Sequence, residues 1–473
     1  MTIAEHLEAV MDEVDKMDRR LAACLKNPDR KPLGRDEIAF GNVLGDRSIT
    51  PEGARHLWDA ANVLLEREKL QSRISVSTAQ RCLDTELQAE IKRAREKDRW
   101  SYHGVVKRAA AALHDTKTFS GNCFFPAFIT HSDEAINLTF GPVRIVSRDI
   151  FDAEYSRLID DQILRATKSN GDRDAPLARI LNGWKTQSEP YAFMVIVTIK
   201  DFEQSIARPV ARQAAEFVLN LLRLMAPHRM GPRIRLAGDS KPETEQAFLT
   251  LTDDGVLGGI FSQGGEGAIL PDDWSDALLR NIGDAKPMID ALADRLVCGD
   301  PFTDPVIERI RYADQLFTEA FQDTSPRQAL VKIVSALEAL CVLPRDEKSR
   351  TLQLRCALAG SRGDPDYIRA VRACVANAYR VRNDVVHGDA PELHEAANAI
   401  ADLQLHLFHI VLHLWKLLVW VHNTKKPQSI RALRRELKLA FETERQRYEE
   451  IWNRMGLENP IDALIDEQTS RHA

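Results

Sequence analysis

Closely spaced cysteine pairs are missing from this sequence. Zinc knuckles and dithiol redox motifs need two cysteines separated by two residues, and no pair here has that spacing. We therefore predict reduced, mostly buried thiols at the seven scattered positions, Cys24, Cys82, Cys123, Cys298, Cys341, Cys356 and Cys374.

The sequence also lacks a recognisable targeting or membrane segment. Its first six residues contain neither the basic nor the apolar region of a signal peptide. A membrane-spanning helix needs about 20 nearly uncharged residues. The strongest apolar run, residues 403–421, is interrupted by His406, His409, His413 and Lys416. We predict a cytoplasmic protein without membrane contact.

An excess of positive charge is absent as well. The 64 lysines and arginines stand against 70 aspartates and glutamates, for a formal net charge of −6. This balance argues against coating nucleic acid through overall charge, but a local basic site is still compatible with it. Apolar residues make up 44% and charged residues 28%, as in folded globular proteins. At about 150 residues per domain, 473 residues correspond to roughly two to four domains.

Residues 1–115 are predicted to form a helical N-terminal region. Thr50 supplies a helix cap, Pro51 suits the first helical position, and Glu52 adds an acid to the first turn. No pattern in this region indicates catalysis.

Residues 116–299 are predicted to form a mixed α+β domain with a sensory or regulatory role. Runs rich in aromatic and β-branched residues predict strands at 123–129, 136–140, 143–146 and 191–199, with further strand signals near 234, 247–252 and 256. Pro209 is predicted to open a helix. The glycines within 255–267 resemble a phosphate loop, but no helix with a basic anchor follows, so hairpin glycines are the favoured interpretation.

Strand signals stop after Pro301, and helical periodicity then continues to about His422. This predicts an all-α bundle of four or five helices over residues 300–424. Residues 425–473 are predicted to form a basic helical tail, which packs Leu433, Leu437 and Phe441 on the bundle or, less favoured, guides RNA. The predicted fold class is therefore multidomain α+β, ending in an all-α helical bundle.

Residues 379–388 are the most informative segment, at the end of a helix that begins near Asp366. With 100° per residue, four polar side chains fall within an arc of about 100°: Arg380, Asn383, Asp384 and His387. The apolar side is predicted to carry Ile368, Val371, Val375, Tyr379 and Val386.

Arg382 falls on that apolar side, between Val371 and Val375 on the helical wheel. A guanidinium on the core side needs a partner, because an unpaired buried charge is expensive. Glu338 lies on the apolar stripe of the preceding helix, so we predict that Glu338 and Arg382 meet between packed helices. The alternative is an exposed Glu338 with Arg382 extended along the bundle surface.

The segment resembles the HEPN superfamily, in particular its ApeA-like branch. The resemblance is carried by Arg382, Asn383 and His387 in the family's order and spacing, by the Leu-Glu-Ala-Leu run that contains Glu338, and by the residues flanking the motif. It covers about residues 300–424.

The resemblance implies a metal-independent endoribonuclease that acts on RNA, with tRNA among the candidate substrates. Such enzymes act as toxins in prokaryotic antiphage defence by abortive infection, which implies a phage-derived trigger. Neither a metal nor another cofactor is implied. The implied catalytic residues are Arg382, Asn383 and His387, and the supporting residues are Arg380, Asp384 and Glu338.

This chemistry suits the residue types. Metal-free cleavage needs groups that remove and donate protons and a cation on the phosphorane-like transition state. Histidine titrates near neutral pH, and arginine holds phosphate with two parallel hydrogen bonds. One chain offers one motif histidine, so a homodimer is expected to bring two together.

Several alternatives stay open at this point. Helix geometry favours Arg380 as the catalytic arginine, whereas the family order favours Arg382. Two other function classes compete with the enzyme: a non-catalytic HEPN dimerisation or adaptor protein, and a small-molecule-binding regulator. His406, His409 and His413 share a helical face, but their apolar surroundings favour core or interface histidines over a metal site.

Overall fold

The computed structural model describes most of the chain, and its residues group into two compact units. The first comprises residues 1–121 and 199–210, and the second comprises 122–198 and 211–473. The described residues are 1–26, 43–44, 47–97, 101–130, 135–168, 175–227, 230–237, 245–251, 257–263, 268, 270–298, 304–361, 364–389 and 391–457.

The first unit is helical, as predicted. Thr50 caps α2 by accepting a hydrogen bond from the backbone N–H of Gly53 at 3.1 Å, and Pro51 is the first helical residue. Leucines, valines and alanines from all four helices share one core. The elements are α1 (Ile3–Lys26), β1 (Val43–Leu44), β2 (Arg47–Ser48), α2 (Pro51–Glu68), α3 (Val76–Lys97) and α4 (Tyr102–His114).

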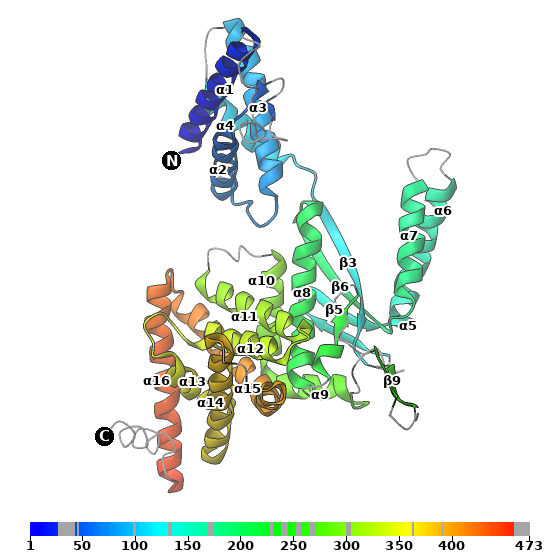
Figure 1. Ribbon diagram of the computed structural model, residues 1–473, viewed down its shortest axis with the longest axis vertical. Helices are drawn as coiled ribbons and strands as arrows, with labels where there is room; N and C mark the ends of the chain where they lie inside the picture. The colour runs from blue at the N-terminus through cyan, green and yellow to red at the C-terminus, as the bar shows by residue number, and fades with distance from the viewer. Residues whose placement is uncertain are drawn as a thin grey trace. The chain divides into compact units, whose positions relative to one another are not determined.

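A sheet with strand order β4-β5-β6-β3-β7 is the centre of the α+β region (Figure 1). The pairs β4/β5, β5/β6 and β3/β7 are antiparallel. The four predicted runs are all strands, as their content of β-branched and aromatic residues predicts. The strands are β3 (Phe119–Phe128), β4 (Asn137–Phe140), β5 (Val143–Ser147), β6 (Phe193–Phe202) and β7 (Arg235–Leu236).

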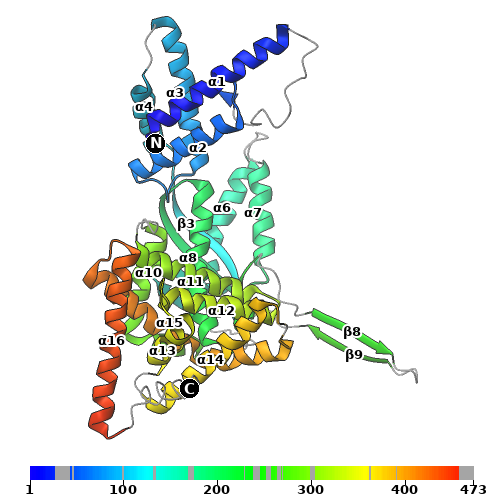
Figure 2. The same cartoon turned by 60° about the vertical axis from the view of Figure 1, so that its left-hand side comes forward.

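Helices cover both faces of this sheet. Met194 and Ile196 of β6 pack with Phe151 and Trp184 on one face, while Phe193 on the other meets the ring of Trp274 edge-on. Helices α6 and α7 form a hairpin, visible in Figure 2. The elements here are α5 (Arg148–Phe151), the π-helical turn η2 (Asp152–Ser156), α6 (Arg157–Lys168), α7 (Ala175–Ser188) and α9 (Trp274–Ile282).

The glycine-rich stretch belongs to a separate hairpin of β8 (Glu245–Leu251) and β9 (Leu257–Gln263). Gly258 and Gly259 lie in β9 and pair with Thr250 and Leu249 of β8. Hairpin glycines are therefore the correct interpretation for the described part of 255–267; the rest of that stretch lies outside the described residues.

Two helix predictions in this region need correction. Pro209 does not open a helix: α8 spans Gln204–Met225, and the proline lies inside it. Pro209 is the sixth residue of α8, so its missing N–H removes only an early bond of the helix. The sequence pattern also does not predict α9 and α10 (Lys286–Cys298), nor the short turns η3 (Gly231–Arg233) and η4 (Gly283–Ala285).

The C-terminal part is an all-α bundle around one central helix. Helix α15 contacts α11, α12, α13, α14 and α16 (Figure 1). Leu433, Leu437 and Phe441 of α16 are buried, which confirms the predicted apolar line of the basic tail. The helices are α11 (Pro305–Gln322), α12 (Pro326–Cys341), α13 (Lys348–Gly360), α14 (Pro365–His387), α15 (Leu393–Lys425) and α16 (Ile430–Met455).

Helix α8 joins the sheet to the bundle through buried contacts. The rings of Phe217 and Trp415 stack with centroids 5.0 Å apart. The amide of Gln404 donates hydrogen bonds to three backbone carbonyls at the end of α8, those of Arg223, Leu224 and Ala226. Carbonyls at the end of a helix have no hydrogen-bond donor within that helix. Gln404 of α15 provides this donor for α8.

A buried polar network strengthens the same junction. Asn220 of α8 donates to the carboxylate of Asp314 in α11 at 2.7 Å, and Arg223 donates to Glu216 at 2.7 Å and to Asn220 at 2.8 Å. Burial, opposed by the hydrogen bond from Asn220 and reinforced by the charge of Glu216, raises the pKa of Asp314 to about 7.

The predicted α+β class is present, with a large helical part and one small antiparallel sheet. The boundaries predicted at 115, 299 and 424 stay predictions. Cys341 and Cys356 are buried free thiols, whereas Cys82, Cys123 and Cys374 are free but half-buried. Among the described helices, α15 alone is long and apolar enough to cross a membrane by length and composition, and 61% of its most apolar window is buried, as in the core helix of a soluble protein.

Candidate functional site at the end of helix α14

The motif lies at the C-terminal end of α14. The carboxylate of Asp364 caps the start of the helix by accepting hydrogen bonds from the backbone N–H groups of Asp366 and Tyr367. His387 is the last helical residue, and Gly388 follows with φ of 91°, a left-handed conformation that suits glycine. The predicted helix bounds are confirmed, and the helix is continuous through Asn383.

The apolar side of α14 differs from the prediction at its end. Ile368, Val371 and Val375 are buried as expected, but Val386 is 53% exposed. No residue from 382 to 389 is buried. The last turn of α14 therefore extends beyond the core of the chain, which leaves Val386 as an apolar side chain in solvent.

Arg382 and Glu338 form the predicted ion pair between α14 and α12. The Nη2 of Arg382 lies 3.3 Å from the Oε2 of Glu338, and the two side chains are 18% and 15% exposed. Nη1 of Arg382 donates to the Oδ1 of Asn383 at 3.0 Å. The guanidinium also lies 5.7 Å from the ring centroid of Tyr379. Glu338, Asn383 and Tyr379 thus hold Arg382 in one orientation.

Two atoms of this pair lack hydrogen-bond partners within the described part of the chain. They are the Nε of Arg382 and the Oε1 of Glu338, and both are buried. Because a buried donor or acceptor without a partner is costly, the pair has capacity for one further contact on each side.

Arg380 belongs to a different, more exposed network. Its Nη1 donates to Asp384 at 3.0 Å, and its Nη2 donates to Glu395 of α15 at 2.6 Å. The hydrogen bond to Glu395 is the main reason that the pKa of Arg380 is raised. The predicted polar arc is therefore divided: Asp384 turns to Arg380, while Asn383 turns to Arg382.

His387 lies exposed on the last turn of α14, next to both networks in sequence. Within the described residues it has no hydrogen-bond partner, so its two ring nitrogens are accessible to a ligand. The single chain thus places one accessible imidazole near two arginines, but it does not bring Arg380 or Arg382 into contact with His387.

Two grooves border this part of the bundle. One, of about 600 Å³, lies between the start of α13 and α14 and is lined by Lys348, Tyr379, Arg380, Asn383 and Asp384, among others. The second, of about 890 Å³, is lined by Glu338 but by neither Arg380 nor Arg382. Lys348 lines both grooves, so it extends the cationic surface beyond the motif.

The second groove holds a further arginine that the sequence reading missed. Arg309 of α11 lines it and donates to the carbonyl of Val342 at 2.5 Å, while its Nε has no partner among the described residues. Burial lowers the pKa of Arg309, although the electrostatic effect of Cys341 opposes this shift. A phosphate group would satisfy such a donor. No motif in the sequence marks Arg309. It lines the same groove as Glu338, but the two residues are far apart in the sequence and lie on different helices.

The histidines of α15 do not form a metal site. His406 is buried and hydrogen-bonds the hydroxyl of Tyr367 at 2.9 Å, whereas His413 faces Glu444 of α16 at 3.6 Å. His406 is thus a core histidine, whereas His409 and His413 are half-buried, which is compatible with the predicted core or interface histidines. One histidine cluster in the first unit was missed: His6, His56 and Asp59. Its only sequence signal is the three-residue spacing of His56 and Asp59.

Comparison of the chain with protein families, with curated proteins and with solved structures found no match.

Alanine substitutions of Arg382 and Arg380 should differ in their effects on stability. Arg382→Ala leaves the carboxylate of Glu338 largely buried without a cation, and we expect the free energy of unfolding to fall by about 2–3 kcal/mol together with loss of RNA cleavage. Arg380 is 56% exposed, so Arg380→Ala should cost less than about 1 kcal/mol while still lowering cleavage. Thermal melting and RNA cleavage of both variants measure these effects.

The reverse outcome would contradict the buried-pair geometry. If Arg382→Ala is inactive but melts like the wild type, while Arg380→Ala cleaves RNA normally, then Arg382 acts on substrate and contributes no packing. The continuous helix through Asn383 favours the first result.

Proposed function

We propose that this protein is a metal-independent endoribonuclease of the HEPN type. The observation that carries the proposal is the end of α14, where an accessible His387 follows an arginine held by Glu338 and Asn383. The resemblance in sequence supplies the reaction class; the geometry supports it with an oriented guanidinium and an imidazole without a partner in the described chain.

The reaction uses the ribose itself as the nucleophile. A base removes the 2′-hydroxyl proton, the 2′-oxygen attacks the phosphorus, and an acid protonates the departing 5′-oxygen. The products are a 2′,3′-cyclic phosphate and a 5′-hydroxyl. Arg382 is proposed to stabilise the charge that develops on the phosphate oxygens through its guanidinium, which is held in one orientation on α14. Asn383 and Glu338 orient Arg382, while Arg380 and Asp384 support the exposed side of the site.

A homodimer completes the proposed site, because acid and base each need a proton-transfer group. The surface around His387 suits a two-fold interface: Val386 next to it is 53% exposed, and Leu393 at the start of α15 is 58% exposed. Burying such apolar side chains against a second copy would stabilise the pair. We place the enzyme in the cytoplasm, where its RNA substrate is, and in antiphage defence, with residues 1–299 sensing a phage-derived trigger or restraining the nuclease.

A second candidate is a non-catalytic HEPN dimerisation or adaptor protein. Acidic side chains occupy the exposed arginine of the motif: Asp384 and Glu395 both pair with Arg380. An arginine whose charge is already paired would attract an RNA backbone less strongly. RNA cleavage by the purified chain is therefore the decisive measurement.

The full chain should cleave total tRNA or mRNA in the presence of EDTA. No step of the proposed reaction uses a metal, so chelation should leave the rate within about twofold, and the product ends should be a 2′,3′-cyclic phosphate and a 5′-hydroxyl. Gel analysis with end-group labelling measures both. Activity that disappears on chelation and returns with magnesium would place the chemistry at another site, and a chain that never cleaves RNA would favour the adaptor.

A further inference from the structure

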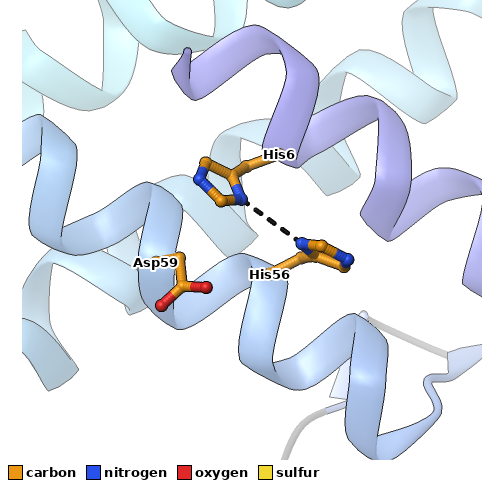
Figure 3. Close-up of side chains that lie close together, drawn as sticks. All are labelled: His6, His56 and Asp59. Carbon is orange, nitrogen blue, oxygen red and sulfur yellow. Dashed lines mark hydrogen bonds between the residues drawn. The ribbon is translucent and has the colours of Figure 1, made fainter. Parts of the chain in front are cut away.

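Two histidines and an aspartate converge in the first unit, away in sequence from the motif. His6 comes from α1, and His56 and Asp59 come from α2, three residues apart and so on the same face of that helix. Figure 3 shows the two imidazole rings facing each other, with Asp59 beside them. One nitrogen of each ring and one carboxylate oxygen all lie within 4.8 Å of one another.

The two rings approach each other through one pair of nitrogen atoms. The Nδ1 atoms of His6 and His56 lie 3.3 Å apart. The ring planes are tilted by 48° with centroids 5.6 Å apart, so the rings do not stack. The two Nδ1 atoms are within hydrogen-bond distance, and the tautomer decides which of them donates. When neither of them carries a proton, both offer a lone pair to a shared ligand.

This separation is the one that a tetrahedral metal ion imposes. Zinc binds imidazole nitrogen at about 2.0–2.1 Å, and two ligands at the tetrahedral angle are then about 3.3–3.4 Å apart. At the right angle of an octahedral site, the same bond lengths would give about 2.9 Å. The 3.3 Å between the two Nδ1 atoms fits the tetrahedral case.

The donor types point in the same direction. Imidazole together with carboxylate suits zinc, whereas magnesium and calcium select oxygen ligands. His6 is only 8% exposed, so its ring is enclosed where α1 packs on α2. The nearby carboxylate of Glu13 is already engaged by Lys16 and Thr50, so it is not a further ligand.

We propose that His6, His56 and Asp59 form a zinc site that joins α1 to α2, with the fourth position taken by water. Both helices contribute a ligand, so a bound ion links the start of the chain to the helix that begins at Pro51. The site is independent of the proposed ribonuclease chemistry, since none of its residues belongs to the motif on α14.

Zinc titration of the full chain tests the site. After chelation and removal of the chelator, calorimetry with zinc chloride should give one ion per chain. His56→Gln and Asp59→Asn should each weaken binding by about 10- to 100-fold or more, since each removes a direct ligand. His103→Gln is the matched control: His103 is an exposed histidine on α4 of the same unit and should leave binding unchanged.

Cobalt gives a second readout. Substituted for zinc, it should produce the intense visible absorption of a tetrahedral site in the wild type and in His103→Gln, but not in His56→Gln. Circular dichroism of each variant shows that the helices persist. His387→Ala should bind zinc normally, so failure of the ribonuclease proposal would not affect this one. Equal zinc affinity in the wild type and both ligand variants, or an octahedral cobalt spectrum, would overturn the proposal.

Discussion

Replacing His387 with alanine should lower RNA cleavage by about a hundredfold to ten-thousandfold, the usual contribution of a positioned proton-transfer group. The melting temperature should stay close to that of the wild type. His387 lies exposed on the last turn of α14, outside the buried core of the bundle. Gly388, not the imidazole, provides the left-handed residue that ends the helix. Cleavage of labelled RNA and thermal melting measure the two effects separately.

His394→Ala is the matched control for this variant. His394 lies near the start of α15, its side chain is 71% exposed, and it pairs with Glu392. It stands outside the motif, so its removal should leave cleavage unchanged. If His387→Ala cleaves RNA at the rate of the wild type and of His394→Ala, the imidazole does not transfer protons and the enzymatic proposal fails.

The second large effect concerns the pH dependence of stability at Asp314. Burial raises the pKa of this carboxyl in the folded chain to about 7, from an ordinary value of 3.8. Between these values the folded state holds a proton that the unfolded state has released. Stability therefore falls as the pH rises from about 4 to 7, by roughly 4 kcal/mol from this group alone at 1.36 kcal/mol per pH unit.

Asp314→Asn should remove this pH dependence. The asparagine keeps an oxygen that can accept the hydrogen bond from Asn220, and it carries no charge to bury. We expect the variant to match the wild type near pH 4 and to exceed its free energy of unfolding by about 2–4 kcal/mol at pH 8. Urea unfolding across this pH range measures the difference.

Asp161→Asn provides the comparison, since Asp161 is exposed on α6 and its substitution should change stability little at any pH. A wild type whose stability does not fall between pH 4 and 7 relative to Asp314→Asn would show that Asp314 ionises freely inside the fold. Water would then have to reach the junction of α8 and α11.

Much of the secondary structure could be predicted from the sequence because local periodicity determines it, although the pattern does not predict α9 and α10. One long-range contact could be predicted as well. The strands follow from runs of β-branched and aromatic residues, and the end of α14 follows from Val-His-Gly. The contact between Arg382 and Glu338 could be predicted because a cation on the apolar side of a helix requires a partner, and a carboxylate lies on the apolar stripe of α12.

Other features depend on tertiary packing that periodicity does not contain. The apolar pattern places Val386 on the core side, but the last turn of α14 extends beyond the core. The helical wheel groups the polar residues of α14 in one arc, but it contains no information about other helices. It therefore could not show that Arg380 bonds Glu395 of α15 or that Asn383 bonds Arg382. His6 and His56 are 50 residues apart, so only the packing of α1 on α2 brings their rings together.

The hydrogen bonds from Gln404 to the end of α8 affect how experiments with truncated chains should be interpreted. A fragment that begins near residue 300 would retain Gln404, Trp415 and Asp314 but lose the carbonyls, the ring and the amide that they contact in α8. Such a fragment would misfold or aggregate for reasons unrelated to regulation. If a truncated chain were not toxic to cells, this would therefore not show whether the missing segment senses a signal. Point substitutions in the intact chain are the informative genetic test.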